Sequence, residues 1–267
     1  MPKVPKSSIS EVICGAKRIE ISTRVWSKGE CMVYLNSEKC LSNFYKNICQ
    51  LFNATSTDVS VEMSCDLDKE SKETSKLRIQ KSVISDNYQT WQKLDKFFNN
   101  HPGQQYSDIR ESTRSFTYYQ DDQWKTHSMM KVSNLVFRRT WNYSDTFMMY
   151  FQGEHGYFKD CRIYSTMINM FLKDWMRRKN VILKSLIFLP CTAYDLNRSE
   201  CFEGIVTQSC DIATRHTFPY KSVITQYERI PSEYFDCKDG LEVTRSIDGK
   251  TATVIISRTH FAFFVWN

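Results

Sequence analysis

Residues 168–180, INMFLKDWMRRKN, carry the pattern that decides the fold of this chain. Apolar residues fill positions i, i+3, i+4 and i+7, the spacing of one face of an α-helix: they are Ile168, Phe171, Leu172 and Trp175. Basic residues at 177–179 suit the negative end of the helix dipole, and an aliphatic strand, LKSLIFL (183–189), follows at once. We therefore expect the stripe to be the inner face of a strand–helix–strand unit, with Trp175 as a core anchor.

The same alternation of strand and helix extends along most of the chain. Period-two patterns predict strands at 18–26, 57–65, 77–84, 114–120, 132–139, 157–164 and 183–189. Helical spacing predicts helices at 41–52, 87–100, 144–153 and 168–180, with a short helical turn at 199–207. Alternating strands and helices imply parallel pairing in an α/β layer or an open solenoid. The predicted fold class is α/β, with irregular leucine-rich-repeat-like strand–helix units.

The two ends of the chain differ from this pattern. Residues 240–267, GLEVTRSIDGKTATVIISRTHFAFFVWN, contain two alternating strands joined at Asp248-Gly249, a strong hairpin signal. A third strand is predicted at 261–266, so the chain should close with a C-terminal antiparallel β-meander. Residues 1–17, which begin MPKVPKSSIS, are predicted to be a flexible N-terminal lead-in, and 18–267 to form one domain.

Composition limits the classes of protein to which the chain can belong. Of 267 residues, 41% are hydrophobic and only 14 are Gly or Pro (8 and 6), which favours a globular protein over a disordered one. The net charge of +6 is spread along the chain, whereas nucleic-acid binders concentrate it on one face, so we expect no nucleic-acid partner. No apolar run reaches the ~18 residues of a membrane span, and MPKVPKSSIS lacks the apolar core of a signal peptide.

The ten cysteines show no spacing typical of a metal site or a redox motif. No pair forms C-x-x-C and none lies beside a His at zinc-finger spacing, so we expect free thiols and no bound metal. Free thiols fit a reducing compartment, and the predicted location is intracellular, in the cytoplasm or the nucleus.

Motifs that carry enzyme chemistry are missing from the sequence. It contains no P-loop, no nucleophile elbow, no dinucleotide fingerprint and no H-E-x-x-H. The carboxylate pairs Asp66/Asp68 and Asp121/Asp122 lie in polar, loop-like segments where solvation explains them. We therefore predict that the chain is not an enzyme and needs no cofactor. A Cys–His pair assembled in an irregular pocket stays open as an alternative.

Tryptophans are the side chains that most often anchor protein interfaces. Trp91 and Trp175 lie on apolar helical stripes, which favours the core for both. Trp124, in QDDQWKTH, has no such stripe and is the better interface candidate. With its neighbours Tyr118, Asp121 and Asp122 it forms the predicted partner-binding set, and 66–76 and 101–125 are the predicted variable surfaces.

The stretch FMMYFQGEHGYFKDCRIYSTMINMFLKDWMRRKNVILKSLIFLP (147–190) resembles the signature of the F-box-associated domain, type 2, of nematode F-box families. In that signature a short helix precedes a strand, an N-x-F-L-K-x-W helix and an L-x-x-L strand. The matching residues here are Thr146–Tyr150, Asn169, Phe171, Leu172, Lys173, Trp175, Leu183 and Leu186. The resemblance is clearest over 130–266 and includes the R-x-DG-x-x-AT core of the last hairpin.

The resemblance implies a substrate-recognition domain of an F-box adaptor, which serves a cullin–RING ubiquitin ligase. The partners would be a protein substrate and, if an F-box is present, the Skp-type linker of the ligase. Residues 1–40 show no L-P-x-x-L opening of an F-box. A stand-alone binding or scaffold module that recruits no ligase is therefore the alternative, ahead of a nucleic-acid binder or an unrecognised enzyme.

Overall fold

The computed structural model describes twelve segments of the chain: 7–14, 17–25, 31–35, 59–63, 79–84, 91–110, 124–141, 143–178, 182–191, 196–210, 217–219 and 234–266. The chain divides into two compact units. The first comprises Met1–Val59 and Asp66–Ile79, and the second comprises Ser60–Cys65 and Gln80–Asn267. The residues predicted to form one domain, 18–267, contribute to both units.

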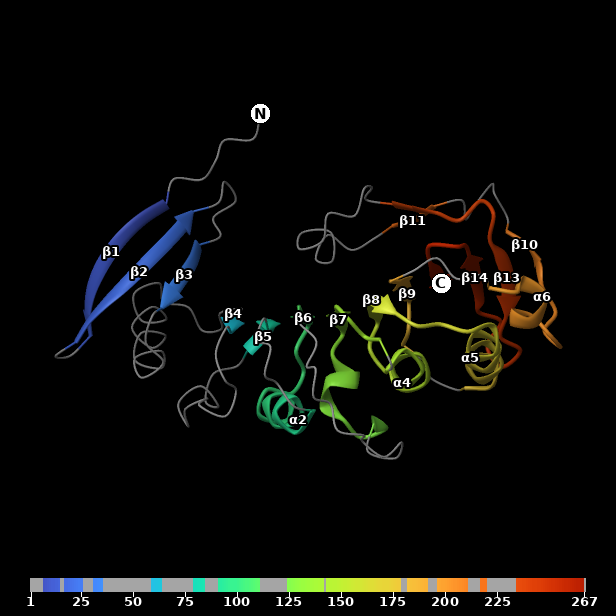
Figure 1. Ribbon diagram of the computed structural model, residues 1–267, viewed down its shortest axis with the longest axis horizontal. Helices are drawn as coiled ribbons and strands as arrows, with labels where there is room; N and C mark the ends of the chain where they lie inside the picture. The colour runs from blue at the N-terminus through green and yellow to red at the C-terminus, as the bar shows by residue number, and fades with distance from the viewer. Residues whose placement is uncertain are drawn as a thin grey trace. The chain divides into compact units, whose positions relative to one another are not determined.

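The first unit contains a three-stranded antiparallel sheet in the order β1-β2-β3 (Figure 1). Its strands are β1 (Ser7–Cys14), β2 (Lys17–Val25) and β3 (Cys31–Leu35). β2 confirms the strand predicted at 18–26. The predicted flexible lead-in is wrong over β1, since every residue from Ser7 to Cys14 is paired in register with β2. The β-branched residues of SSISEVIC favour this extended state.

A mixed sheet of ten strands forms the centre of the second unit, in the order β10-β13-β14-β15-β9-β8-β7-β6-β5-β4. The bounds of its strands are β4 Val59–Met63, β5 Ile79–Ile84, β6 Tyr106–Ile109, β7 Asn134–Phe137, β8 His155–Cys161, β9 Ser185–Pro190, β10 Gln208–Ser209, β13 Leu241–Thr244, β14 Thr251–Ile256 and β15 Phe261–Val265. Strands β5 to β9 are parallel, and the C-terminal strands β13, β14 and β15 are antiparallel. β15 pairs with β9 and so joins the two halves.

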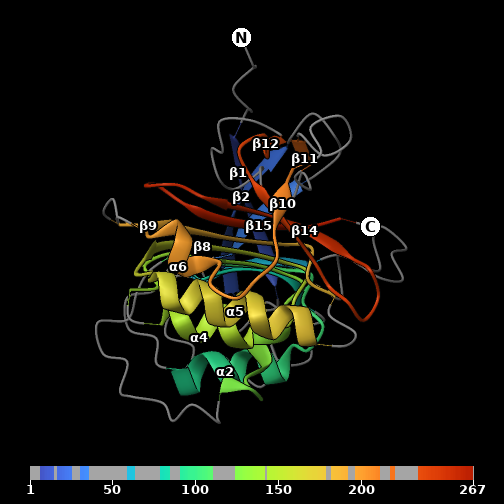
Figure 2. The ribbon, with the colours of Figure 1, turned by 90° about the vertical axis from the view of Figure 1, so that its right-hand side faces the viewer.

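The parallel strands follow one another in chain order, and a helix lies in each connection. These helices are α2 (Trp91–Asn100), the 3₁₀ turn η4 (Ser128–Lys131), α4 (Ser144–Tyr150) and α5 (Ser165–Arg177). Right-handed crossovers that advance in one direction place every helix on the same face of the sheet. Figure 2 shows α2, α4 and α5 together on one side of the sheet. The parallel pairing predicted from the alternation of strands and helices is confirmed.

A row of phenylalanines fills the space between the sheet and these helices. Phe137, Phe158, Phe188 and Phe261 are register partners on four neighbouring strands. The rings of Phe158 and Phe188 stack with 4.9 Å between their centroids, and the ring of Phe261 lies tilted beside Phe188 at 6.2 Å. Phe147 of α4 lies 4.7 Å from Phe158. All are 0–1% exposed, so the row is the core of the helical layer.

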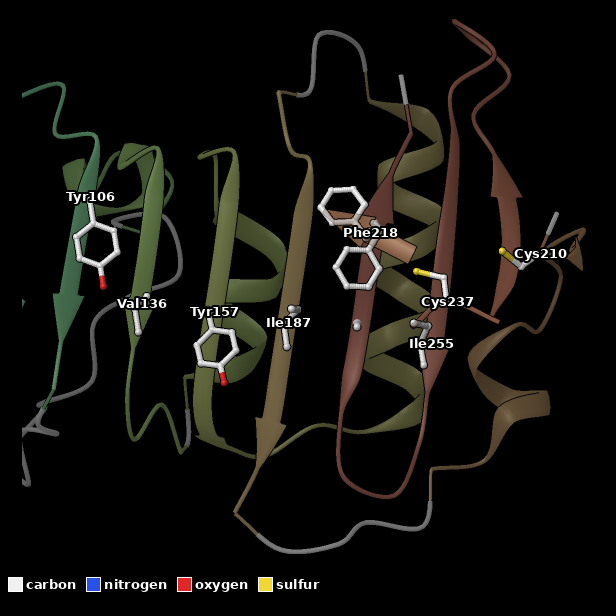
Figure 3. Close-up of a cluster of buried hydrophobic side chains, with 10 residues drawn as sticks. Tyr106, Val136, Tyr157, Ile187, Cys210, Phe218, Cys237 and Ile255 are labelled. Carbon is white, nitrogen blue, oxygen red and sulfur yellow. The ribbon is translucent and has the colours of Figure 1, made fainter. Parts of the chain in front are cut away.

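The opposite face of the sheet is covered as well, as parallel sheets require. Figure 3 shows Tyr106, Val136, Tyr157 and Ile187 along successive strands, on the face turned away from the helices. Toward the C-terminal strands this face is covered by the paired strands β11 (Thr217–Pro219) and β12 (Tyr234–Asp236). Phe218 of β11 stacks on Phe264, with 4.5 Å between ring centroids.

The stripe at 168–180 is core, as predicted. In α5, Ile168 and Leu172 are fully buried and Phe171 and Trp175 are 5% and 2% exposed. The predicted C-terminal meander is also confirmed, with Thr244 opposite Thr251 across the hairpin. Its connection is longer than a two-residue turn, and Gly249 adopts φ +70° within it. α6 (Arg198–Cys201) lies in the helical turn predicted at 199–207.

Among the parallel strands β5 to β9, one was missed. β6 lies within 101–125, which was predicted to be a variable surface, yet all four of its residues are buried between β5 and β7. Its polar residues gave no strand signal, because their partners are distant in the sequence. Ser107 accepts a hydrogen bond from Ser82, and Asp108 pairs with Arg138. The elements predicted at 41–52 and 114–120, and the surface loop predicted at 66–76, lie outside the described residues.

Candidate protein-interaction groove

Two connections leave the carboxyl ends of β7 and β8 and are fastened to each other. The Thr140 amide donates to the Lys159 carbonyl (3.0 Å) and the Trp141 amide to the Asp160 carbonyl (2.9 Å). Trp141 also forms an isolated parallel bridge with Cys161. The pairing of β7 and β8 thus continues past the end of β7 and fixes the backbone of Trp141. In open α/β sheets, ligands bind beyond the carboxyl ends of the strands.

Ser144, the first residue of α4, ties the same connections together. Its hydroxyl donates to the carbonyl of Trp141 (3.0 Å) and accepts from the amide of Arg162 (3.0 Å). Its side chain is buried, and the residue is 1% exposed. One buried hydroxyl therefore holds both connections at the start of α4.

The backbone is strained at this place. Arg139, Trp141 and Asp160 adopt φ of 63°, 35° and 48°, and they are the three non-glycine residues with positive φ in the described segments. Asp160 lies in a bulge of β8, where the register with β9 shifts between Lys159 and Cys161. Such conformations cost roughly 1–3 kcal/mol each and concentrate at functional sites. The bonds described above keep them in place.

A groove of about 480 Å³ lies beside these connections, between α4 and the first turns of α5. We call it the α4–α5 groove. Its lining comes from the β7–α4 connection, α4, the β8–α5 connection and α5: Trp141, Ser144, Asp145, Thr146, Met149, Tyr150, Arg162, Tyr164, Thr166, Met167 and Met170.

The lining of the groove includes three exposed, large hydrophobic side chains. Six large hydrophobic residues are exposed in the described part of the chain, and three of them line this groove. They are Trp141, Tyr164 and Met170, with exposures of 43%, 57% and 58%. Contiguous exposed apolar surface marks interaction sites, and methionines adapt to differently shaped partners. The groove is therefore suited to an apolar segment of another protein.

One cation, Arg162, lines the groove. The guanidinium of Arg162 lies over the Trp141 ring, 5.8 Å from its centroid. Among the described residues no carboxylate forms an ion pair with Arg162. The carboxylate of Asp145 accepts the amide hydrogen bond of Thr146 (2.8 Å) at the start of α4.

Of the predicted partner-binding residues, the structure describes Trp124. It is 1% exposed and packs edge-on against Trp91, with 4.3 Å between ring centroids, so its prediction as an interface residue is wrong. Tyr118, Asp121 and Asp122 lie outside the described residues. Trp91 and Trp175 are core residues, as predicted. Among the tryptophans that the structure describes, the exposed one is Trp141, which no local pattern distinguished from Trp124.

Two serine–histidine pairs raise the question of nucleophilic chemistry. The Ser185 hydroxyl lies 2.7 Å from Nδ1 of His155, but the two residues are 0% and 3% exposed, so a substrate cannot reach them without local opening. The Ser257 hydroxyl lies 2.9 Å from Nδ1 of His260 and also accepts the His260 amide. The second pair thus closes the turn between β14 and β15. Burial lowers the pKa of His260.

Five cysteines are free thiols, and all of them except Cys191 are buried: Cys161, Cys191, Cys201, Cys210 and Cys237. Burial raises the pKa of Cys237 to about 12 and raises that of Cys161 further, so neither forms a nucleophilic thiolate readily. In the segments that the structure describes, no three His, Cys, Asp or Glu side chains gather to hold a metal ion. None of the described helices has the length and apolarity to cross a membrane.

Comparison with models of known protein families, with curated proteins and with solved structures finds no match for this chain. A function must therefore be inferred from the α4–α5 groove itself. Its three notable properties are three exposed hydrophobic side chains, a strained and fastened backbone, and a guanidinium with which no described carboxylate forms an ion pair.

Proposed function

We propose that this chain is a non-enzymatic protein-interaction domain and that the α4–α5 groove receives a segment of its partner. The observation that carries the proposal is the convergence of Trp141, Tyr164 and Met170 on one groove. Exposing these side chains has a cost in water, which a bound apolar segment removes. The size of the groove, about 480 Å³, suits two or three side chains of a peptide.

We also propose that the parallel half of the sheet is built from irregular leucine-rich-repeat-like units. Strands β5 to β9 are sequential and parallel with their helices on one face, which supports irregular leucine-rich-repeat-like units. Repeats of this kind present extended binding surfaces. The resemblance of 147–190 to the type 2 F-box-associated domain of nematodes supports the same role, recognition of a protein substrate in the cytoplasm or nucleus.

Two partners distinguish the two forms of this proposal. An adaptor of a cullin–RING ubiquitin ligase binds both a substrate and the Skp-type linker, whereas a stand-alone binding or scaffold module binds a target alone. Co-precipitation of the full chain, scored for ligase subunits and for other proteins, separates them. Recovery of the linker supports the adaptor, and recovery of other partners alone supports the stand-alone module.

The groove itself is tested by Met170→Glu, which places a carboxylate on its apolar lining. Ile182→Glu is a matched control, because Ile182 is 59% exposed and Met170 is 58% exposed. Ile182 follows α5 and precedes β9, so it lies near the amino end of a parallel strand, whereas the groove lies at the carboxyl ends of β7 and β8. We expect quantitative mass spectrometry to show partners that are lost with Met170→Glu and retained with Ile182→Glu. Equal retention by both variants contradicts the proposal.

A further inference from the structure

We propose that the α4–α5 groove selects partner segments in which a carboxylate side chain flanks an apolar anchor. This inference rests on the proposed function of the groove and adds the chemistry of its partner. It is carried by Arg162, the cation of the groove, and by its position on Trp141.

Arg162 is placed to meet an incoming anion. Its amide is fixed by the buried Ser144 hydroxyl at 3.0 Å, so the start of its side chain is held at the edge of the groove. The planar guanidinium presents its N–H donors in one plane, where they match the two oxygens of a carboxylate. The residue is exposed, and no described carboxylate pairs with it.

The groove lining holds one other charged side chain, Asp145. Its carboxylate accepts the amide hydrogen bond of Thr146 at the start of α4 and forms no ion pair with Arg162 among the described residues, so the guanidinium keeps its charge for a partner. The first turn of α5 contains no acidic residue, and its N-cap, Tyr164, makes no side-chain hydrogen bond to the helix. The positive end of the helix dipole therefore adds to the field of Arg162 instead of being neutralised.

The position of Arg162 also decides against a basic partner. Exposed Trp and Tyr rings are good sites for Lys or Arg side chains, because a cation is attracted to the ring face. Here the ring of Trp141 already has a guanidinium over it. A second cation at this ring would be repelled by Arg162, so the aromatic lining is left for apolar contact and the free charge for a carboxylate.

The test uses twelve-residue fluorescein-labelled peptides with one Leu-Phe pair flanked by Glu, by Gln or by Lys. Binding to the full chain is measured by fluorescence anisotropy at low and high salt. We expect the Glu peptides to bind about threefold to fivefold more tightly than the Gln peptides at low salt, the scale of an exposed ion pair, with a smaller ratio at high salt. The Lys peptides should be weakest. Arg162→Gln should remove the preference and Arg162→Glu should invert it.

Failure of this inference can be told apart from failure of the proposed function. Binding that is lost with Met170→Glu, retained with Ile182→Glu and indifferent to peptide charge overturns the carboxylate preference and leaves the groove as the binding site. Binding that Met170→Glu does not weaken overturns both. If no peptide binds, a short carboxylate-bearing segment is not what the groove recognises, and the inference is wrong.

Discussion

Replacement of Ser144 by alanine tests whether the groove is held by its two fastened connections. The hydroxyl makes two hydrogen bonds of 3.0 Å, to the Trp141 carbonyl and the Arg162 amide. A buried hydrogen bond contributes about 0.5–1.5 kcal/mol net. The Arg162 amide keeps a longer bond to the Trp141 carbonyl at 3.3 Å, so the loss is partly offset. We expect Ser144→Ala to lower the free energy of unfolding by about 1–2 kcal/mol.

The assay is urea unfolding followed by far-UV circular dichroism and tryptophan fluorescence. Ser199→Ala is the control, since Ser199 is an exposed serine in the first turn of α6 and should cost less than about 0.5 kcal/mol. Ser144→Ala should also weaken partner capture, because Trp141 and Arg162 lose their common anchor. A loss of stability no larger than that of Ser199→Ala, with capture unchanged, would show that Ser144 does not hold the groove.

Three further outcomes follow from the described residues. Phe158→Ala removes the ring that stacks on Phe147 and Phe188 and should cost about 3–5 kcal/mol in urea unfolding, whereas an exposed aromatic such as Tyr164 should cost far less when truncated. Among Cys161, Cys191, Cys201, Cys210 and Cys237, native iodoacetamide labelling mapped by mass spectrometry should modify Cys191 first, because the other four are buried; fast labelling of Cys161 would contradict the packing. Burial lowers the pKa of His127 below its usual value of about 6.5, so the unfolded chain takes up the proton first and stability should fall as the pH drops below that value. His127→Gln should flatten this slope in pH-dependent urea unfolding.

Local patterns were enough to predict the elements whose burial is decided within their own sequence. The stripe of α5 and the hairpin at Asp248-Gly249 are complete signals over about a dozen residues each, and both are confirmed. The order of strands and helices then determined parallel pairing. β6 could not be found in this way, because Ser107 and Asp108 look like surface residues until Ser82 and Arg138 satisfy them.

The burial of Trp124 and the exposure of Trp141 also depend on contacts between residues that are distant in the sequence. Trp124 and Trp141 both lie in polar segments without a helical stripe. Trp124 is buried because Trp91, 33 residues earlier, packs against it. Trp141 is exposed because its backbone is bonded to the end of β8 at φ 35°. Neither contact has a local sequence signal. The usable hint was Met170, an apolar residue that falls outside the buried stripe of α5.

The charge buried on the sheet face turned away from the helices is already paired, which favours the groove over that face as the proposed binding site. Asp108 is fully buried, yet Arg110 and Arg138 pair with it at 3.0 and 3.1 Å. A buried carboxylate whose charge is balanced by two guanidinium groups is a poor binding site for a ligand. The guanidinium of Arg162, in contrast, has no described carboxylate beside it and faces an open groove.

The most direct test of the account is photo-crosslinking from inside the groove. A benzoylphenylalanine placed at Tyr164 (57% exposed) lies on its lining, and one at Ile182 (59% exposed) lies outside it with the same access to solvent. Irradiation in cells followed by mass spectrometry should give partner adducts from position 164 and few from position 182. Equal adducts from the two positions, or adducts from position 182 alone, would contradict the claim that the α4–α5 groove is where this protein binds its partner.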